Sequence, residues 1–247
     1  MTQQALPART ARLGRPLGLT NRVEAVLLVL PGGVPASTRR PSPLAASAAQ
    51  ALARHAVGAA ARVDAALTAH VLRPRYRGWN GDAAHLAADA AWALAEIDRR
   101  YGDVPVCLAG SGTGARAALR TAGHRLVAAV AALATWAPDG DSESVDHLAD
   151  RQVLFVHGTD DEVCAPGASY RLAERAREVS PTVCRFEVHT ERHTLRRYRT
   201  EVAALTADFA LGALCARDFS RALADAFAAP PPLGLRMPLA AGFGTSR

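Results

Sequence analysis

The chain has 247 residues and a formal net charge of +6 at pH 7, and 49% of its residues are hydrophobic. This length and composition fit one sizeable α/β core better than two small domains. All 29 basic residues are arginines scattered along the sequence, without the interleaved aromatic stripe that favours nucleic-acid binding, so we expect no nucleic-acid partner.

The sequence lacks the signals of a membrane or secreted protein. No stretch of about 18 or more apolar residues is free of charged breaks, which argues against a membrane partner. Residues 1–20 form a basic N-terminal extension without the apolar centre of a secretory signal. The four cysteines lie far apart, and none stands at metal-ligand spacing from a histidine. We expect a cytoplasmic protein with free thiols, no metal and no cofactor.

Apolar runs and helical stretches alternate between residues 21 and 215. Buried strands are expected at residues 23–30, 69–72, 104–109, 126–133, 153–156 and 183–188. Helices are expected at residues 45–61, 82–99, 168–179 and 193–214, with one more starting at Thr113. This alternation predicts an α/β fold with a mostly parallel sheet flanked by helices on both faces. Residues 216–247 are rich in proline, glycine and alanine, and we expect a flexible or loosely docked tail.

The strand at residues 104–109 leads into a glycine turn, residues 110–114 (GSGTG). Gly110, Gly112 and Ala115 match a dinucleotide-binding fingerprint, but no acidic residue occurs between Asp103 and Asp139 to bind a ribose. A phosphate-binding P-loop requires a lysine, and the chain contains none. The remaining interpretation is a strand–elbow–helix turn of the pattern G-x-S-x-G, which presents a nucleophile.

Two downstream segments fit this third interpretation. Residues 153–166 (VLFVHGTDDEVCAP) combine an apolar run with a polar loop, and residues 186–197 (FEVHTERHTLRR) combine a strand with a histidine-bearing loop. Together with the glycine turn and residues 29–33 (VLPGG), they resemble the α/β-hydrolase superfamily, closest to small bacterial members with little or no cap. The resemblance covers residues 23–214.

The resemblance implies a role for particular residues. Asp161 would be the acid and His193, at the head of the last helix, the base. The turn at Gly32 and Gly33 would supply one oxyanion-hole amide and Thr113 the other.

One position departs from the pattern, because Gly112 occupies the place of the nucleophile and has no side chain to attack with. Ser111 is a possible substitute, although its side chain should face the opposite way. Thr113 equally fits a helix cap. Taken singly, Asp161 fits a polar turn residue and His193 a solvated helix cap as well.

Several further residues have two possible roles. Trp79 and Trp136 follow strands. Trp79 either lines a pocket or packs under its loop, and Trp136 either forms a pocket wall or plugs the pocket rim. Arg116 is expected to pair with a carboxylate such as Asp82. His157 is expected to hydrogen-bond local backbone.

The sequence therefore predicts an α/β-hydrolase-fold protein related to enzymes that hydrolyse small-molecule esters, thioesters or amides. Its triad is degenerate, with Gly112 vacant and the pair of His193 and Asp161 retained, so that acyl transfer is impaired or replaced by non-covalent acid/base chemistry. Two alternatives stay open: a non-catalytic binding or scaffold protein, and an active hydrolase that uses Ser111. The sequence does not indicate the oligomeric state.

Overall fold

A computed structural model describes residues 9–19, 21–138 and 143–245. Its central sheet has the strand order β1-β4-β3-β5-β6-β7-β8-β9, and β2 also pairs with β4. The strands from β4 to β9 in this order pair in parallel, whereas β1 and β2 run antiparallel to β4. The strands are β1 (Arg12–Leu13), β2 (Leu17–Gly18), β3 (Ala25–Leu30), β4 (Leu67–Arg73), β5 (Val106–Ser111), β6 (Val127–Leu133), β7 (Gln152–Gly158), β8 (Val183–Val188) and β9 (Met237–Pro238).

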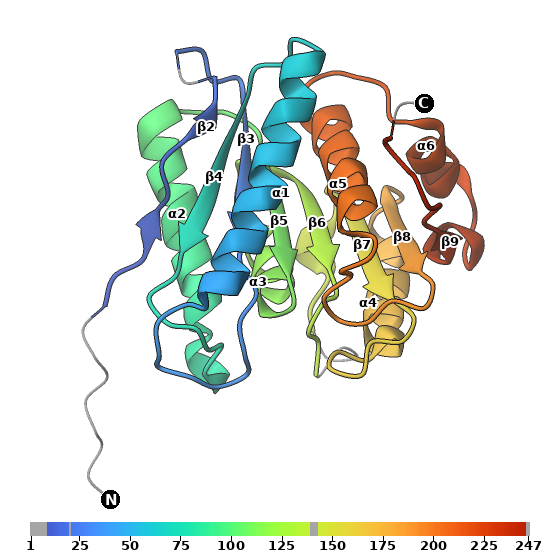
Figure 1. Cartoon of the computed structure of the whole chain (residues 1–247), viewed down its shortest axis with the longest axis horizontal. Helices are drawn as coiled ribbons and strands as arrows, with labels where there is room; N and C mark the ends of the chain where they lie inside the picture. Colours follow the sequence, from blue (N-terminus) through green and yellow to red (C-terminus); the bar gives the residue numbers. More distant parts are fainter. Residues whose placement is uncertain (1–8, 20, 139–142, 246–247) are drawn as a thin grey trace, which may run out of the picture.

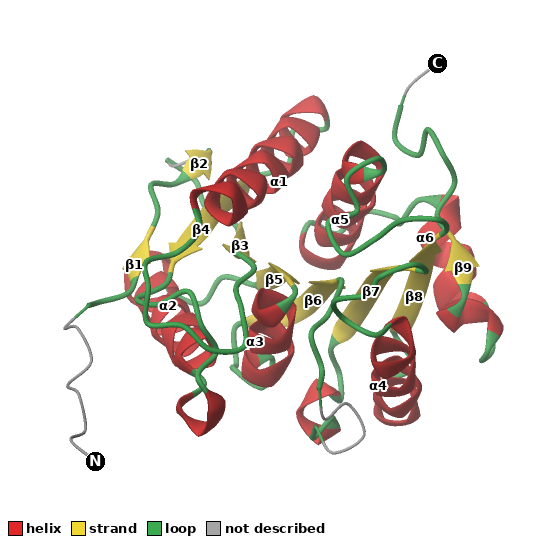
Figure 2. Ribbon diagram, turned by 60° about the horizontal axis from the view of Figure 1, so that its bottom comes forward, coloured by secondary structure: helices red, strands yellow, loops and turns green. Residues whose placement is uncertain are grey.

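Helices cover both faces of the sheet, as Figure 2 shows. The inner strands are almost wholly apolar and buried, because a parallel sheet with helices on both sides exposes neither face to water. One core forms against α2 (His85–Tyr101), α3 (Thr113–Thr121) and α4 (Pro166–Val179). The other forms against α1 (Pro43–Arg62), α5 (Arg199–Leu214) and α6 (Arg221–Ala228). The predicted fold class is confirmed.

The strand order sets where a site can form. The chain passes from β3 to β4 on one side and then returns to β5 on the other side of β3 (Figure 1). The connections after β3 and β5 therefore diverge at the carboxyl ends of two neighbouring strands, where open α/β sheets bind ligands. Leu30 pairs with Gly110 in register, which brings the turn after β3 beside the turn after β5.

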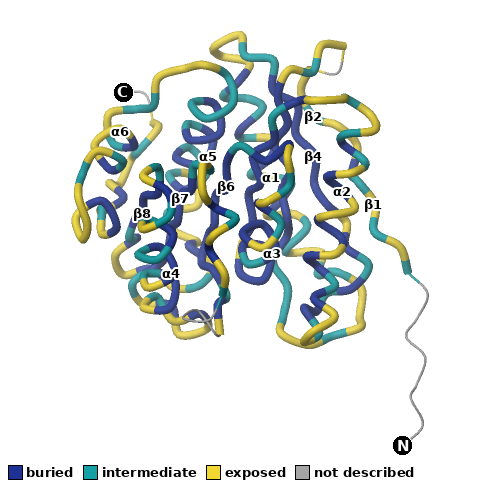
Figure 3. Tube along the Cα trace, turned by 180° about the vertical axis from the view of Figure 1, so that it is seen from behind, coloured by how far each residue is buried: buried dark blue, intermediate teal, exposed yellow. Residues whose placement is uncertain are grey.

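The C-terminal segment is integrated into the fold. Leu223 of α6 is fully buried, and β9 pairs with β8 and so becomes the edge of the sheet. Figure 3 shows that α6 contains buried as well as exposed residues. The buried Arg185 on β8 donates a hydrogen bond of 3.1 Å to the carbonyl oxygen of Leu235. This docking differs from the flexible or loosely docked tail expected for residues 216–247. The content of proline and glycine indicated flexibility, but the few apolar side chains of this segment cover a sheet edge that would otherwise be open.

The predicted N-terminal extension lies partly outside the described residues, which begin at residue 9. From there, β1 and β2 run along β4, and the carbonyl oxygen of Gly14 lies 2.8 Å from Nδ1 of the buried His70. No helix among the described residues is long and apolar enough to span a bilayer.

Candidate active site

The turn between β5 and α3 contains three glycines under different constraints. A Cβ atom on Gly110 would lie 2.3 Å from the carbonyl oxygen of Gly114, and one on Gly114 would lie 2.5 Å from that of Leu30. Only glycine fits at these two positions, because backbone atoms cannot yield to a side chain. Gly112 has φ 55° and ψ −118°, and a Cβ there would meet only the His193 ring, 3.5 Å from both Cε1 and Nε2. A side chain at position 112 would thus point directly at the imidazole.

The imidazole of His193 is held by a carboxylate. Its Nδ1 lies 2.9 Å from Oδ2 of Asp161, whose side chain is fully buried, whereas the His193 side chain is 30% exposed. The two residues come from the loops after β8 and β7. The structure therefore brings together the acid and base expected from the sequence.

The position of His193 within its loop differs from the expectation. The helix expected at residues 193–214 is α5, which begins at Arg199. His193 lies instead in a turn closed by a hydrogen bond of 3.0 Å from Leu195 N–H to the Arg192 carbonyl oxygen. Glu191 fixes this loop, because its carbonyl oxygen accepts a hydrogen bond from Asp160 N–H at 3.0 Å. The loop that presents the base therefore packs on the loop that presents the acid. No sequence motif around Glu191 predicts that it joins these two loops.

Asp161 is surrounded by hydrogen-bond donors. Its Oδ1 accepts from the backbone N–H groups of Val163 at 2.9 Å and Cys164 at 2.8 Å, and its Oδ2 lies 3.1 Å from Nε2 of His157. Burial raises the pKa of Asp161, but the hydrogen bonds from His157, Cys164, His193 and Val163 outweigh it, and the net pKa lies well below the usual range. The residue is therefore a carboxylate at neutral pH.

His157 contributes more than the local backbone contact expected for it. Its Nε2 lies 2.9 Å from the carbonyl oxygen of Cys164 as well as beside Asp161. Both neighbours are acceptors, so this nitrogen carries a proton. The only sequence signal for this contact is the spacing of four residues between His157 and Asp161, which is too common to identify a pair.

The same reasoning assigns the tautomer of His193. Because Oδ2 of Asp161 can only accept, Nδ1 of His193 is the donor, and in the neutral ring the lone pair is on Nε2. This nitrogen faces the space beside Gly112. In the described part of the chain, His193 has no hydrogen bond other than that to Asp161. The arrangement is that of a general base with its accepting nitrogen directed at an empty position.

The proposed oxyanion donors lie beside this position. A Cβ on Gly33 would stand 2.9 Å from Oγ1 of Thr113, so the turn after β3 touches the first residue of α3. No backbone hydrogen bond joins the amide of Gly33 or Thr113 to another described residue. Oγ1 of Thr113 is buried without a hydrogen-bond partner among the described residues, so the side chain does not cap the helix.

Ser111 is exposed at the end of β5 and points elsewhere. Its Oγ lies 3.0 Å from the place where a Cβ on Gly32 would stand, so the hydroxyl is directed at the turn after β3. The side-chain direction at position 112 is toward His193 instead. The positive φ of Gly112, directly after the end of β5, turns the backbone between these two positions.

Trp79 and Trp136 pack against each other and against Arg116. Their ring centroids are 6.1 Å apart, and the guanidinium carbon of Arg116 lies 4.5 Å from the Trp79 ring and 4.9 Å from the Trp136 ring. Arg116 forms an ion pair with Glu143, which is a loop carboxylate as expected, although the example suggested by the sequence is Asp82. Glu143 lies in the long connection after β6, and a contact across such a distance in sequence leaves no local signal.

The backbone of Trp136 also anchors the glycine turn. Its N–H donates to the carbonyl oxygen of Gly112 at 3.2 Å, and the N–H of Arg116 donates to the same oxygen at 3.2 Å. The backbone of Trp136 thus holds the glycine turn in place.

One group of side chains has donor atoms close enough to hold a metal ion. Atoms of Asp161, Cys164 and His193 lie within 4.8 Å of one another. Burial, together with the charge of Asp161, raises the pKa of the Cys164 thiol to about 12, which opposes the thiolate that a metal needs. Binding there would also replace the hydrogen bond between Asp161 and His193. The geometry fits an acid–base pair better than a metal centre.

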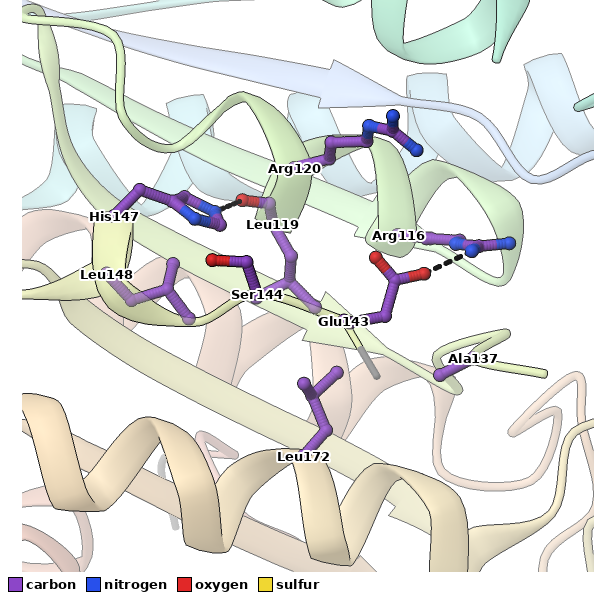
Figure 4. A pocket seen from close by; sticks show the side chains of 9 residues that line it. All are labelled: Arg116, Leu119, Arg120, Ala137, Glu143, Ser144, His147, Leu148 and Leu172. Atoms are coloured by element: carbon purple, nitrogen blue, oxygen red, sulfur yellow. Dashed lines mark hydrogen bonds and ion pairs between the residues drawn. The ribbon is translucent and has the colours of Figure 1, made fainter. Parts of the chain in front are cut away.

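Two hollows lie outside this pair. The first, of about 420 Å³, opens between α3, α4 and the connection after β6, and its lining includes Arg116, Leu119, Glu143 and Leu172 (Figure 4). The second, of about 590 Å³, is an open depression lined by Arg196, Arg197, Arg199 and Thr200. Neither lining includes Gly112, Asp161 or His193.

Comparisons with known proteins identify the fold. No family model and no curated protein matches the sequence. Among solved structures, an alpha-beta serine hydrolase homologue from Coxiella burnetii has a TM-score of 0.58 at 15% identity, covering 84% of this chain and 97% of its own. XC6422 from Xanthomonas campestris, an α/β serine hydrolase without lid, has a TM-score of 0.56 at 17% identity, covering 82% and 86%. Est1E from Butyrivibrio proteoclasticus has a TM-score of 0.60 at 12% identity, covering 83% and 94%.

These similarities, with the strand order and the positions of the loops, define the class: this chain has the α/β-hydrolase fold, as the sequence motifs predicted.

Proposed function

We propose that this protein acts on a small-molecule ester, thioester or amide by non-covalent acid/base chemistry, with His193 as general base. The observation that carries the proposal is the direction of the missing side chain at Gly112, whose Cβ would lie 3.5 Å from Nε2 of His193. In an α/β hydrolase this direction belongs to the nucleophile. With glycine there, the space beside the base is open to a water molecule.

The proposed reaction proceeds without an acyl-enzyme. His193 Nε2 removes a proton from a water molecule as the water oxygen bonds to the substrate carbonyl carbon, and the amides of Gly33 and Thr113 donate to the resulting oxyanion. The tetrahedral adduct then collapses with loss of the alcohol, thiol or amine, which takes the proton back from His193. Asp161, ionised by its hydrogen bonds, stabilises the imidazolium between these two steps.

The loss of the covalent route makes the expected rates low. The members of a serine triad act as a unit, and removal of its nucleophile costs several orders of magnitude in acyl transfer. We therefore expect activity well below that of a complete triad and no accumulation of an acyl-enzyme.

Partial exposure of His193 favours this proposal over a purely structural site. Its imidazole is 30% exposed and thus accessible to a small molecule, and both tryptophans contact Arg116. The scaffold alternative expects such aromatic residues to fill the space over the base. The Ser111 alternative requires its hydroxyl to turn from Gly32 toward His193, which would change the register of the glycine turn.

Hydrolysis of short-chain p-nitrophenyl esters tests the proposal. We expect slow turnover by the natural protein, loss of turnover in His193→Gln, and unchanged turnover in Ser111→Ala. A rate that survives in His193→Gln would contradict the role of the base. Rapid turnover that is abolished by Ser111→Ala would show that Ser111 is the nucleophile.

A further inference from the structure

The loop that carries His193 concentrates positive charge. Four of the eight residues at positions 192–199 are arginines, and all four are exposed: Arg192, Arg196, Arg197 and Arg199. Glu191 is the only acidic residue between positions 188 and 200, and it is buried. It forms an ion pair of 3.8 Å with Arg197. One carboxylate of this segment therefore pairs with one of its four arginines, and the next acidic residue is Glu201 in the first turn of α5.

This arrangement is unfavourable for the helix that follows. The N-terminus of a helix carries partial positive charge, so basic residues there are destabilising and acidic residues are stabilising. Helix α5 nevertheless begins at Arg199, preceded by Arg196 and Arg197, and its N-cap residue Tyr198 makes no side-chain capping bond. Glu201 in the first turn of α5 offsets part of this positive charge, but the three arginines at positions 196, 197 and 199 outnumber it. A bound anion would supply further negative charge.

The same arginines line a depression that can hold such an anion. The open hollow of about 590 Å³ is bounded by Arg196, Arg197, Arg199 and Thr200. Guanidinium groups present several donors in one plane and match the oxygens of a phosphate group, and a threonine hydroxyl adds a further donor. The lining of the hollow therefore suits a phosphate group better than an apolar group.

One residue that lines the hollow is near the proposed base in the chain. Arg196 follows His193 by three residues, so their Cα atoms are at most about 11 Å apart. His193 is not part of the lining, so a ligand that reached the imidazole would extend beyond its phosphate group.

We propose that the loop of residues 192–199 binds a phosphate group of a small-molecule ligand, with Arg196 and Arg199 as its main contacts. The binding of phosphate does not depend on the chemistry proposed for His193. A nucleic acid is the less favoured ligand, because the arginines are confined to one loop with a single aromatic neighbour, Tyr198.

Calorimetric titration with inorganic pyrophosphate at constant ionic strength tests the proposal. We expect Arg196→Ala/Arg199→Ala to bind pyrophosphate about tenfold more weakly than the natural protein, or worse, because each lost contact is a charge-assisted hydrogen bond. The matched control is Arg54→Ala/Arg217→Ala, which removes two exposed arginines elsewhere, and we expect less than about a twofold change.

Each other outcome contradicts the proposal. Equal weakening in both double variants would show a diffuse charge effect, and no binding by the natural protein would exclude a phosphate site. Tighter binding of a single-stranded RNA oligonucleotide, lost in Arg196→Ala/Arg199→Ala, would favour a nucleic-acid surface. Thermal unfolding shows whether the double variant is still folded. Removal of positive charge from the start of α5 should leave its melting temperature unchanged or raise it.

Discussion

Restoring a side chain at position 112 should create a covalent hydrolase. In Gly112→Ser the new Cβ would lie 3.5 Å from Nε2 of His193. One further C–O bond brings Oγ within hydrogen-bond reach of that nitrogen, about 2.6–3.2 Å. The amides of Gly33 and Thr113 stay in place, so the variant would hold a nucleophile, a base, an acid and an oxyanion hole.

The change has a calculable cost. The φ of Gly112 is 55°, a conformation that costs a residue with a side chain about 1–3 kcal/mol. Loss of glycine from the unfolded chain returns about 0.4–1 kcal/mol. We therefore expect Gly112→Ser to be less stable than the natural protein by roughly 0–3 kcal/mol and still folded.

We expect a large increase in kcat for this small loss of unfolding free energy. A triad nucleophile contributes several orders of magnitude in optimised enzymes, and we expect at least about a hundredfold increase in kcat for short-chain esters from an unoptimised one. An initial burst of p-nitrophenol should accompany the increase, because acylation of the serine releases p-nitrophenol before the acyl-enzyme is hydrolysed in a second step. The matched control is Gly112→Ala, which adds the same Cβ and strain without a hydroxyl and should show no increase. A folded Gly112→Ser protein with no gain over Gly112→Ala would refute this account of the turn.

Three further predictions concern the scaffold and the electrostatics of the site. Gly110→Ala should be far more destabilising than Gly112→Ala, by more than about 3 kcal/mol in urea unfolding, because its Cβ would lie 2.3 Å from a backbone oxygen; equal stability would contradict the packing described here. Asp161→Asn should destabilise the protein at neutral pH. The depressed folded-state pKa of Asp161 contributes stability above the unfolded value of about 4 and loses it as pH falls, so the difference in unfolding free energy from the natural protein should shrink below about pH 4; a difference that grew with acidity would have the wrong sign. Leu223→Ala should cost about 2–5 kcal/mol in denaturant unfolding, because Leu223 is fully buried; a negligible effect would mean that α6 contributes little to the fold.

Local patterns in the sequence predict most of the strands and helices of the fold. The apolar runs at β3 and β6 predicted buried parallel strands, since residues covered on both faces must be continuously hydrophobic. The C-terminal segment was harder, because β9 has only two residues and its partner β8 is remote in sequence. Such an edge strand is specified by the surface that it covers rather than by its own composition.

The site was predictable where a motif fixed a loop and unpredictable where a contact joined distant loops. Asp161 and His193 each follow a recognisable strand, and parallel strands deliver both residues to one edge of the sheet. The ion pair of Arg116 with Glu143 and the support of the loop by Glu191 depend on how loops fold over that edge. The start of α5 was placed too early, because residues 193–198 have the composition of a helix but form turns.

The most direct test of the central claim is covalent labelling with a serine-reactive alkyl fluorophosphonate, read by intact-mass and peptide mass spectrometry. The account predicts no adduct on the natural protein or on Gly112→Ala, and one adduct on Gly112→Ser located at position 112 and lost when His193→Gln is added. An adduct on the natural protein at Ser111 that depends on His193 would contradict the claim that the nucleophile position is Gly112.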